Sequence, residues 1–285
     1  MKRQSENLFI GDTLKTLKTL ETGVVDIGVT SPPYNKQENK KGWLVKNVRY
    51  DSSSDKKTEQ DYQKGQIEVL NELYRIIKPG GSFFYNHKMR WERGEVIHPM
   101  QWLAMTHWTI RQEIIWDRMI AANIRGWRFW QTDERIYWLY KPIAEQKIGK
   151  EISSRHALLT SIWRFPPERD NPHPAPFPVV LPLRCIYSIL DEQPEATVID
   201  PYIGSGSTAI AAKLLGYNYI GIDISKEYID LAKKRLAQIN NCVAIANEEK
   251  ARHVVRKTFM ERKMNGDFTG KFGAHQKERI IATLF

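Results

Sequence analysis

The sequence predicts an α/β fold built on a doubly wound, mostly parallel sheet, with an antiparallel hairpin and loop insertions. Two observations predict it. Short apolar runs alternate with segments of helical spacing along most of the chain, which is the pattern of strands and helices in a parallel sheet. The run Thr197–Asp200 also leads through a glycine-rich turn straight into a helical segment, as strands do in open sheets that bind ligands at their carboxyl ends.

The first half of the chain supplies strands and one long helix. The apolar run Val24–Val29 ends abruptly at two prolines, which indicates a buried strand followed by a sharp loop. Apolar residues at helical spacing predict a helix over Ile67–Ile77 that stops at Pro79-Gly80-Gly81. A strand is expected to follow at Ser82–Tyr85, and the hairpin is expected from the strands Ile110–Trp116 and Arg135–Tyr140.

In the second half, strands and helices alternate regularly. The expected elements are a helix at Leu181–Leu190, a strand at Thr197–Asp200, a helix at Thr208–Leu215, a strand at Tyr219–Asp223 and a helix at Lys226–Ile239. Seven prolines between residues 164 and 182 predict a rigid connection between the two halves.

Composition narrows the class of protein. The 285 residues carry 43 Lys and Arg against 33 Asp and Glu, a formal net charge of +10, which favours an acidic partner such as nucleic acid or an anionic membrane. No apolar run approaches the roughly 18 residues of a membrane span, and the N-terminus lacks the apolar stretch of a signal peptide. Cys185 and Cys242 are the only cysteines, which excludes a disulfide scaffold and a Cys-rich zinc site. The composition as a whole predicts a cytosolic, basic, globular protein, and we expect no metal site.

The glycine-rich turn is the first candidate binding site. It reads Asp200-Pro201-Tyr202-Ile203-Gly204-Ser205-Gly206, and glycines there allow a ligand to approach the backbone closely. Asp223 ends the next expected strand, where an acid can accept both ribose hydroxyls of an adenosine-containing cofactor. Residue 209 is Ala, so the full dinucleotide pattern is missing. A cofactor without a pyrophosphate, such as S-adenosyl-L-methionine, is therefore favoured over NAD, with an ordinary strand-to-helix turn as the alternative.

The second candidate site is the segment Ser31-Pro32-Pro33-Tyr34, at the carboxyl end of an expected strand. Two prolines stiffen the backbone and remove two donors. The Ser31 hydroxyl and the Pro32 carbonyl can then act as paired acceptors, while Tyr34 offers a flat face. This arrangement suits a planar ring with an exocyclic amino group, although a proline-stiffened turn is the simpler interpretation of the segment taken alone.

Taken together, the two motifs resemble those of the amino-group DNA methyltransferases, which methylate the exocyclic nitrogen of cytosine or adenine. Their catalytic signature is Asp, Asn or Ser followed by Pro-Pro and an aromatic residue, matched here by Ser31, Pro32, Pro33 and Tyr34. The catalytic motif precedes the cofactor motif, as in the permuted β class of this family. Further similar segments are Asn7–Asp12, Ile77–Gly81 and His173–Pro178, so the resemblance covers roughly residues 7–239.

The resemblance implies a Rossmann-like methyltransferase fold, S-adenosyl-L-methionine as cofactor, and a role for each matched residue. Gly204, Ser205 and Gly206 would approach the methionine part of the cofactor, with Asp200 and the adjoining Pro201 near its amino group. The ribose hydroxyls would bind Asp223. The pocket would be closed by Asp12 and by the segment containing His173 and Pro176. A helix-capping role for Asp12 and a purely structural role for His173 stay open.

The substrate follows from the same resemblance. In this family Ser at the first motif position accompanies cytosine N4 more often, and Asp or Asn accompanies adenine N6 more often, so cytosine is favoured and adenine is the alternative. Methylation of carbon 5 would need a Cys nucleophile, usually after a proline, and neither cysteine has that setting. A catalytically idle DNA-binding subunit, or methylation of a protein or RNA amide, are the hypotheses from other classes.

We expect one methyltransferase domain over residues 1–285. Its parts are the catalytic-loop segment 1–35, a DNA-facing loop at 36–64, central strands with DNA-recognition insertions at 65–163, the cofactor-binding segment 164–239 and a basic extension at 240–285. Positive charge is in excess in 36–64, 86–128 and 241–285, which favours double-stranded DNA as partner. The resemblance further implies a prokaryotic, nucleoid-associated protein of a restriction-modification system. It leaves open a homodimer and a cognate restriction endonuclease as partners, and no membrane is expected.

Overall fold

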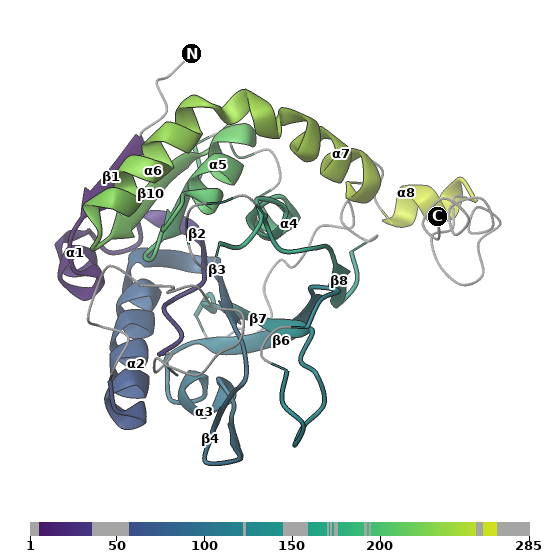
Figure 1. Cartoon of the computed structure of the whole chain (residues 1–285). Coiled ribbons are helices and arrows are strands. Elements are labelled where there is room, and N and C mark those ends of the chain that lie inside the picture. The colour runs from purple at the N-terminus through teal and green to yellow at the C-terminus, as the bar shows by residue number, and fades with distance from the viewer. Residues whose placement is uncertain are drawn as a thin grey trace.

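An eight-stranded, mostly parallel sheet forms the centre of the computed structural model, which describes residues 6–35, 57–121, 124–144, 159–169, 171, 173, 176–190, 193, 195–254 and 259–266. In order across the sheet (Figure 1), its strands are β1 (Glu6–Ile10), β10 (Asn218–Asp223), β9 (Thr197–Asp200), β2 (Val25–Thr30), β3 (Ile77–His87), β7 (Asp133–Tyr140), β6 (Thr109–Asp117) and β8 (Ile162–Arg164). The run from β1 to β3 is parallel. Strand β7 is antiparallel to both of its neighbours, and β8 is parallel to β6. The doubly wound fold and the antiparallel hairpin are thus confirmed.

Helices cover both faces of the sheet. The helices are α1 (Thr13–Thr19), α2 (Glu59–Ile76), α3 (Met100–Leu103), α4 (Val180–Ile189), α5 (Ser207–Leu214), α6 (Lys226–Ala237), α7 (Val243–His253) and α8 (Phe259–Met264), with a 3-10 turn at Ile239–Cys242. One hydrophobic core joins the sheet to α4, α5 and α6, and a second joins it to α1, α2 and α3. Alternate residues of β3 enter opposite cores, Phe84 the first and Phe83 and Tyr85 the second. A strand buried on both faces in this way reads as a continuous apolar run.

The expected elements are present, with shifted ends. Helix α2 begins at Glu59, eight residues before the expected start, because the Thr58 side chain accepts the Asp61 N–H and caps it. The last part of the expected 36–64 loop is therefore helical, while residues 36–56 lie outside the described residues. Pro79-Gly80-Gly81 does not end the helix but lies inside β3. Gly81 is needed there because an added Cβ would lie 2.7 Å from the Asp26 carbonyl oxygen.

Several short helices and strands were not predicted from the sequence. Strand β1, helix α1, strand β8 and the separate hairpin of β4 (Arg90–Glu92) and β5 (Glu95–Ile97) were not expected as elements. Elements of three to seven residues are too short to show a period. Among the described residues, no helix is long and apolar enough to cross a membrane.

The C-terminal extension is partly built into the fold. Helix α7 packs on α4, where the Arg184 guanidinium binds Glu249 through two hydrogen bonds of 2.7 and 2.9 Å, and both side chains are buried. Arg184 thus anchors α7 to α4. Residues 267–285 lie outside the described part of the chain.

Candidate functional site at the carboxyl edge of the sheet

The two sequence motifs meet at the carboxyl edge of the sheet. Strands β10, β9, β2 and β3 are neighbours there, so Asp223, Asp200 and Ser31 end or follow three adjacent strands. After β9 the chain adds the next strand, β10, on one side, and after β2 it adds β3 on the opposite side. The direction in which strands are added therefore reverses between β9 and β2. Open α/β sheets bind ligands at such a reversal of strand order.

Asp200 connects the two motifs. Its side chain is fully buried and accepts hydrogen bonds from the Thr30 hydroxyl (2.6 Å), the Thr208 hydroxyl (2.7 Å) and the Tyr202 N–H (3.0 Å). Burial raises the pKa of this carboxyl to about 6, because the charged form loses its water. Thr30 immediately precedes Ser31, so one carboxylate fixes the glycine-rich turn, the start of α5 and the end of β2 together.

The glycine-rich turn has the backbone that its composition predicts. Gly204 and Gly206 have φ angles of +49° and +87°, in the left-handed region that favours glycine. Gly206 also caps α5, and the buried Ser205 lies between them. The Pro201 carbonyl accepts the Thr13 hydroxyl at 2.8 Å, which ties the turn to α1.

The two acids expected at the cofactor occupy different settings. Asp223 accepts the Gly204 N–H at 3.0 Å and the Ser225 N–H at 2.9 Å, one on each carboxylate oxygen. Its orientation at the end of β10 is thus fixed beside the glycine-rich turn. Asp12 caps α1 and accepts the Lys15 N–H at 2.9 Å, which is the structural role that the sequence left open. A cofactor contact for Asp12 stays a prediction.

The proline-rich connection covers the turn. The imidazole of His173 lies so close to Gly204 that an added Cβ there would be 3.0 Å from Nε2. Burial, together with the charge of Arg235, lowers the pKa of His173 to about 4. Pro176 is half-buried in the segment that leads into α4, whereas Pro174 lies outside the described residues.

Asn171 and Arg235 belong to the same cover and were missed by the sequence analysis. Asn171 donates to the Ser205 hydroxyl at 3.1 Å and accepts the His173 N–H at 2.9 Å. Arg235 donates to the Ser205 carbonyl at 2.7 Å. Both lie far from Ser205 in sequence, and no local pattern marks them.

The Ser-Pro-Pro-Tyr segment is held by a buried polar network. The Ser31 and Tyr34 hydroxyls are 2.6 Å apart, and the Tyr34 hydroxyl donates to Glu134 Oε2 at 3.0 Å. Asn86 Nδ2 donates to the same Glu134 oxygen and to the Tyr34 hydroxyl, each at 2.9 Å. Arg118 pairs with the other Glu134 oxygen at 3.2 Å. The buried residues Asn86 and Glu134 therefore belong to the site, although the sequence did not mark them.

Tyr34 is packed rather than open in this structure. The residue is 6% exposed, and its ring lies 4.5 Å from the His87 ring, centroid to centroid. The neighbouring Pro33 carbonyl accepts the Tyr62 hydroxyl at 2.8 Å, which secures the segment to α2. Pro32 is buried. Stacking of Tyr34 on a base therefore requires the ring to change its packing, and this role stays a prediction.

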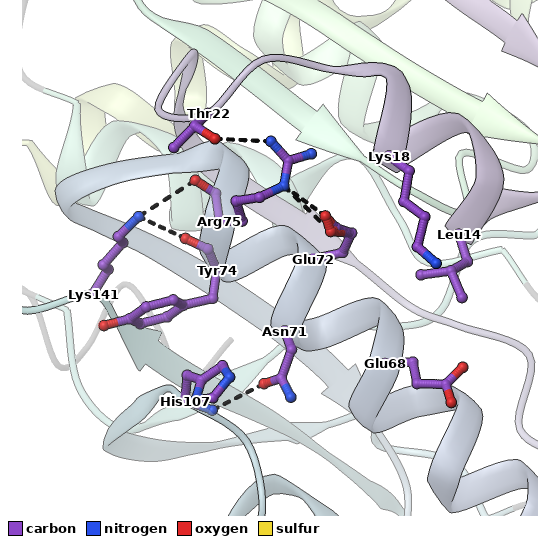
Figure 2. A pocket seen from close by; sticks show the side chains of 10 residues that line it. All are labelled: Leu14, Lys18, Thr22, Glu68, Asn71, Glu72, Tyr74, Arg75, His107 and Lys141. Carbon is purple, nitrogen blue, oxygen red and sulfur yellow. Dashed lines mark hydrogen bonds and ion pairs between the residues drawn. The ribbon is translucent and has the colours of Figure 1, made fainter.

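A separate groove lies on the α1 and α2 side of the molecule. It encloses about 610 Å³, and Figure 2 shows that Glu72, Arg75 and Lys141 in its lining bond to their own surroundings. Arg75 pairs with Glu72 at 2.6 Å, and Lys141 Nζ donates to the Tyr74 and Ile77 carbonyls. None of the expected site residues lines it. Its polar groups stabilise the end of α2, and we assign it no ligand.

Comparison with known proteins decides the family. The family model described as DNA methylase (N6_N4_Mtase) matches residues 25–234, which include both motifs. The chain belongs to this N6/N4 DNA methylase family. It is accordingly an amino-group DNA methyltransferase.

Within the described residues, no group of three or more His, Cys, Asp or Glu side chains is placed to hold a metal ion.

Relatives of the methylase extend over most of its length. It is 25% identical over 275 residues to the type II methyltransferase M.BglII of Bacillus subtilis, which covers 83% of this chain and 70% of the relative. It is 28% identical over 280 residues to M.HinfI of Haemophilus influenzae, which covers 88% and 75%.

Two solved structures share the fold of the methylase. The PvuII cytosine-N4-specific DNA methyltransferase matches with a TM-score of 0.64 at 16% identity, over 85% of this chain and 94% of that one. A DNA modification methylase of Thermus thermophilus, TTHA0409, solved with S-adenosyl-L-methionine, matches with a TM-score of 0.59 at 24% identity, over 82% and 95%.

The residues of the methylase fit S-adenosyl-L-methionine, the methyl donor of its family. Gly204 leaves clear the space that a Cβ would fill beside His173. Asp223 supplies an oriented carboxylate of the kind that binds ribose hydroxyls. The turn carries no Lys of a phosphate-binding loop, as suits a cofactor without phosphates.

Proposed function

We propose that this methyltransferase transfers the methyl group of S-adenosyl-L-methionine to the exocyclic N4 amino group of a cytosine flipped out of double-stranded DNA. The observation that carries the proposal is the position and hydrogen-bond polarity of Ser31. It follows β2 directly, next to the strand that ends in the cofactor turn. The same chemistry on adenine N6 is the second candidate.

Glu134 determines which way the hydrogen bonds run. A carboxylate paired with Arg118 only accepts, so the single hydrogen of the Tyr34 hydroxyl points to Glu134. In the 2.6 Å pair between Ser31 and Tyr34, Ser31 must then be the donor. The Ser31 oxygen already accepts the Asn86 amide, whose Nδ2 lies at 3.3 Å. Since a hydroxyl oxygen has two lone pairs, one stays available as an acceptor for an amino N–H.

Asn86 adds a second acceptor by the same reasoning. Its Nδ2 must face the Glu134 carboxylate, which fixes the amide orientation. Its Oδ1 is buried without a hydrogen-bond partner among the described residues. A buried unpaired acceptor is costly, and an amino group of a bound base would satisfy it. Ser31, the Pro32 carbonyl and Asn86 are therefore the proposed acceptors for the target.

These acceptors address the chemical difficulty of the reaction. The lone pair of an exocyclic amino group is conjugated with its ring, which makes the nitrogen a poor nucleophile. Acceptors that hold both amino hydrogens favour a more pyramidal nitrogen with its lone pair directed at the cofactor side. When bound, S-adenosyl-L-methionine supplies the electrophilic methyl group. The protein contributes orientation and electrostatic placement, with no covalent enzyme intermediate.

Cytosine is preferred over adenine on one ground. Ser31 is the first residue of a motif in which Ser accompanies cytosine N4 more often in the resembling family. Mass spectrometry of nucleosides from DNA treated with the protein and cofactor tests the proposal. N4-methylcytosine is the expected product. N6-methyladenine would show that adenine is the substrate instead, and the absence of any methylated base would favour an idle DNA-binding subunit.

Glu134→Gln tests the proposed polarity. A Gln that keeps its oxygen toward Arg118 turns Nε2 toward Asn86 Nδ2, so two donors oppose each other and Tyr34 loses its acceptor. Loss of a charge-assisted hydrogen bond of about 1.5–3 kcal/mol predicts a kcat lower by about 10- to 100-fold. Cofactor affinity, measured by calorimetry, should stay unchanged. Glu113→Gln is the matched control, because Glu113 forms a more exposed pair on the neighbouring β6; an equal loss in both variants would contradict the assigned role.

The partners follow from the proposed reaction. We propose double-stranded DNA as substrate, bound by the positive segments 36–64, 86–128 and 241–285 around the base pocket, with affinity that falls steeply with salt. The likeness to type II methyltransferases supports a place in a restriction-modification system. A single domain over 1–285 and an association with the nucleoid belong to the same proposal, and a cognate endonuclease and a homodimer are the partners to look for.

A further inference from the structure

An aromatic surface lies beside the site, on the connection between β6 and β7. Its members are large and exposed: Trp127 is 57%, Phe129 98% and Trp130 64% exposed. The connection from residue 118 to residue 132 contains three arginines and no Asp or Glu. Exposed aromatic side chains with arginines and without carboxylates suit a polyanion with stacked rings.

The base of this connection is bonded to the proposed catalytic segment. Arg118 N donates to the Thr132 carbonyl at 2.8 Å and closes the connection. The Arg118 side chain pairs with Glu134, which accepts the Tyr34 hydroxyl. Phe129 lies five residues before Glu134, so its Cα is within about 18 Å of that residue even if the chain is fully extended. DNA that delivers a base to Ser31 and Tyr34 therefore passes within reach of Phe129.

The connection is also supported from the other side, by the β4–β5 hairpin. The Arg128 guanidinium lies 4.0 Å from the centroid of the Trp91 ring, and the Trp91 and Trp127 rings meet edge to face at 6.4 Å. In Figure 1 this hairpin and the β6–β7 connection project from the same side of the molecule.

The hairpin is in turn fixed to the site. Arg90 binds Glu59 through two hydrogen bonds of 2.6 and 2.7 Å and lies 4.7 Å from the centroid of the Tyr62 ring. The Tyr62 hydroxyl donates to the Pro33 carbonyl. The aromatic surface is thus held on two sides by contacts that end in the Ser-Pro-Pro-Tyr segment.

We propose that Phe129 is a wedge that enters the DNA duplex and fills the space left by the flipped base. Trp127 and Arg128 pack on the hairpin and support Phe129. Phe129 itself is nearly fully exposed and carries no polar group. Apolar side chains of this kind insert between base steps in proteins that distort DNA. The inference rests on the proposed function, because it requires a target base that leaves the stack.

A substrate with an unpaired target separates a wedge from a general DNA contact. Once the methylated sequence has been read from modified DNA, two duplexes with one site each are compared. In the first the target base is paired; in the second it lies opposite an abasic position, where the cost of flipping is already reduced. Phe129→Ala should lower kcat/KM on the paired duplex by about 10- to 100-fold, the value of one lost stacking contact, and by less than about threefold on the abasic duplex.

Met105→Ala is the matched control, because Met105 is also apolar and 68% exposed but lies at the opposite end of β6. It should leave both rates unchanged. An equal loss of Phe129→Ala on both duplexes, or no loss on either, would overturn the wedge. Phe129→Ala could instead change the molecular mass of the protein in sedimentation and affect kcat/KM equally on both duplexes. The aromatic surface would then be a contact between copies of the chain, and the wedge would be overturned. Failure of the wild-type protein to methylate DNA would instead reject the proposed function and the wedge with it.

Discussion

Replacing Gly206 by Ala tests the geometry of the glycine-rich turn. Gly206 has a φ of +87°, and an added Cβ would lie 2.9 Å from Ala232 Cβ and 3.1 Å from Ala232 Cα on α6. The left-handed backbone costs a non-glycine residue about 1–2 kcal/mol. Overpacking against a buried backbone adds about 1–3 kcal/mol. The expected loss in free energy of unfolding is therefore about 2–5 kcal/mol.

Gly216→Ala is the matched control for this substitution, at the other end of the same helix. Gly216 has a φ of +84°, and nothing lies within 4 Å of an added Cβ. It should lose only the backbone cost of about 1–2 kcal/mol. The difference between the two variants thus isolates the contact with Ala232.

Urea denaturation followed by circular dichroism gives both free energies of unfolding, and calorimetry gives the affinity for S-adenosyl-L-methionine. Gly206→Ala should weaken cofactor binding, because α5 and the turn must shift away from α6, whereas Gly216→Ala should not. Equal losses of stability in the two variants would refute the close approach of Gly206 to Ala232. Unchanged cofactor affinity in Gly206→Ala would refute the placement of the cofactor at this turn.

Two further predictions concern buried charges. Glu249→Ala leaves the Arg184 guanidinium buried without its partner and should lower the free energy of unfolding by about 3–5 kcal/mol, whereas Glu248→Ala removes an exposed pair and should change it by less than about 1 kcal/mol in the same urea experiment. The pKa of Asp200 is raised to about 6 in the folded protein, so its contribution to the free energy of unfolding is lost as pH rises from about 4 to 6. The pKa of His173 is lowered to about 4, so its contribution is lost as pH falls from about 6.5 to 4. Each loss amounts to up to about 3 kcal/mol. Unfolding measured between pH 4 and 7 should therefore show Asp200→Asn and His173→Gln departing from the wild type with opposite slopes, and parallel curves would contradict both shifts.

The sequence predicted the glycine-rich turn and the Ser-Pro-Pro-Tyr segment because each is local. A strand that ends in Gly204 and Gly206, or in two prolines, marks its own position at the carboxyl edge, and parallel strands bring such ends together. Asn86 was within reach of the same rule, since it follows the expected strand Ser82–Tyr85 and also lies at that edge.

Glu134 was out of reach for a physical reason. It lies near the start of β7, and it meets the carboxyl ends of β2 and β3 only because β7 is antiparallel to β3. The sequence predicted a hairpin between β6 and β7 but gave no sign of which strand the hairpin would join. Pairing partners of that kind depend on long-range packing, which no local pattern encodes. The polarity of Ser31 therefore depends on a residue that only the assembled sheet could identify.

The permuted order of the motifs has little effect on the site because contact between strands, not order along the chain, places them. Ile27 of β2 pairs with Val198 of β9, and a 2.6 Å hydrogen bond joins Thr30 to Asp200 across 170 positions of sequence. A shift of the glycine-rich turn would be transmitted through this bond to Ser31, one residue further on. In the proposed reaction, the distance between methyl donor and acceptor would thus be set by one strand pairing and one buried carboxylate. Either motif can come first in the chain as long as these two contacts are kept.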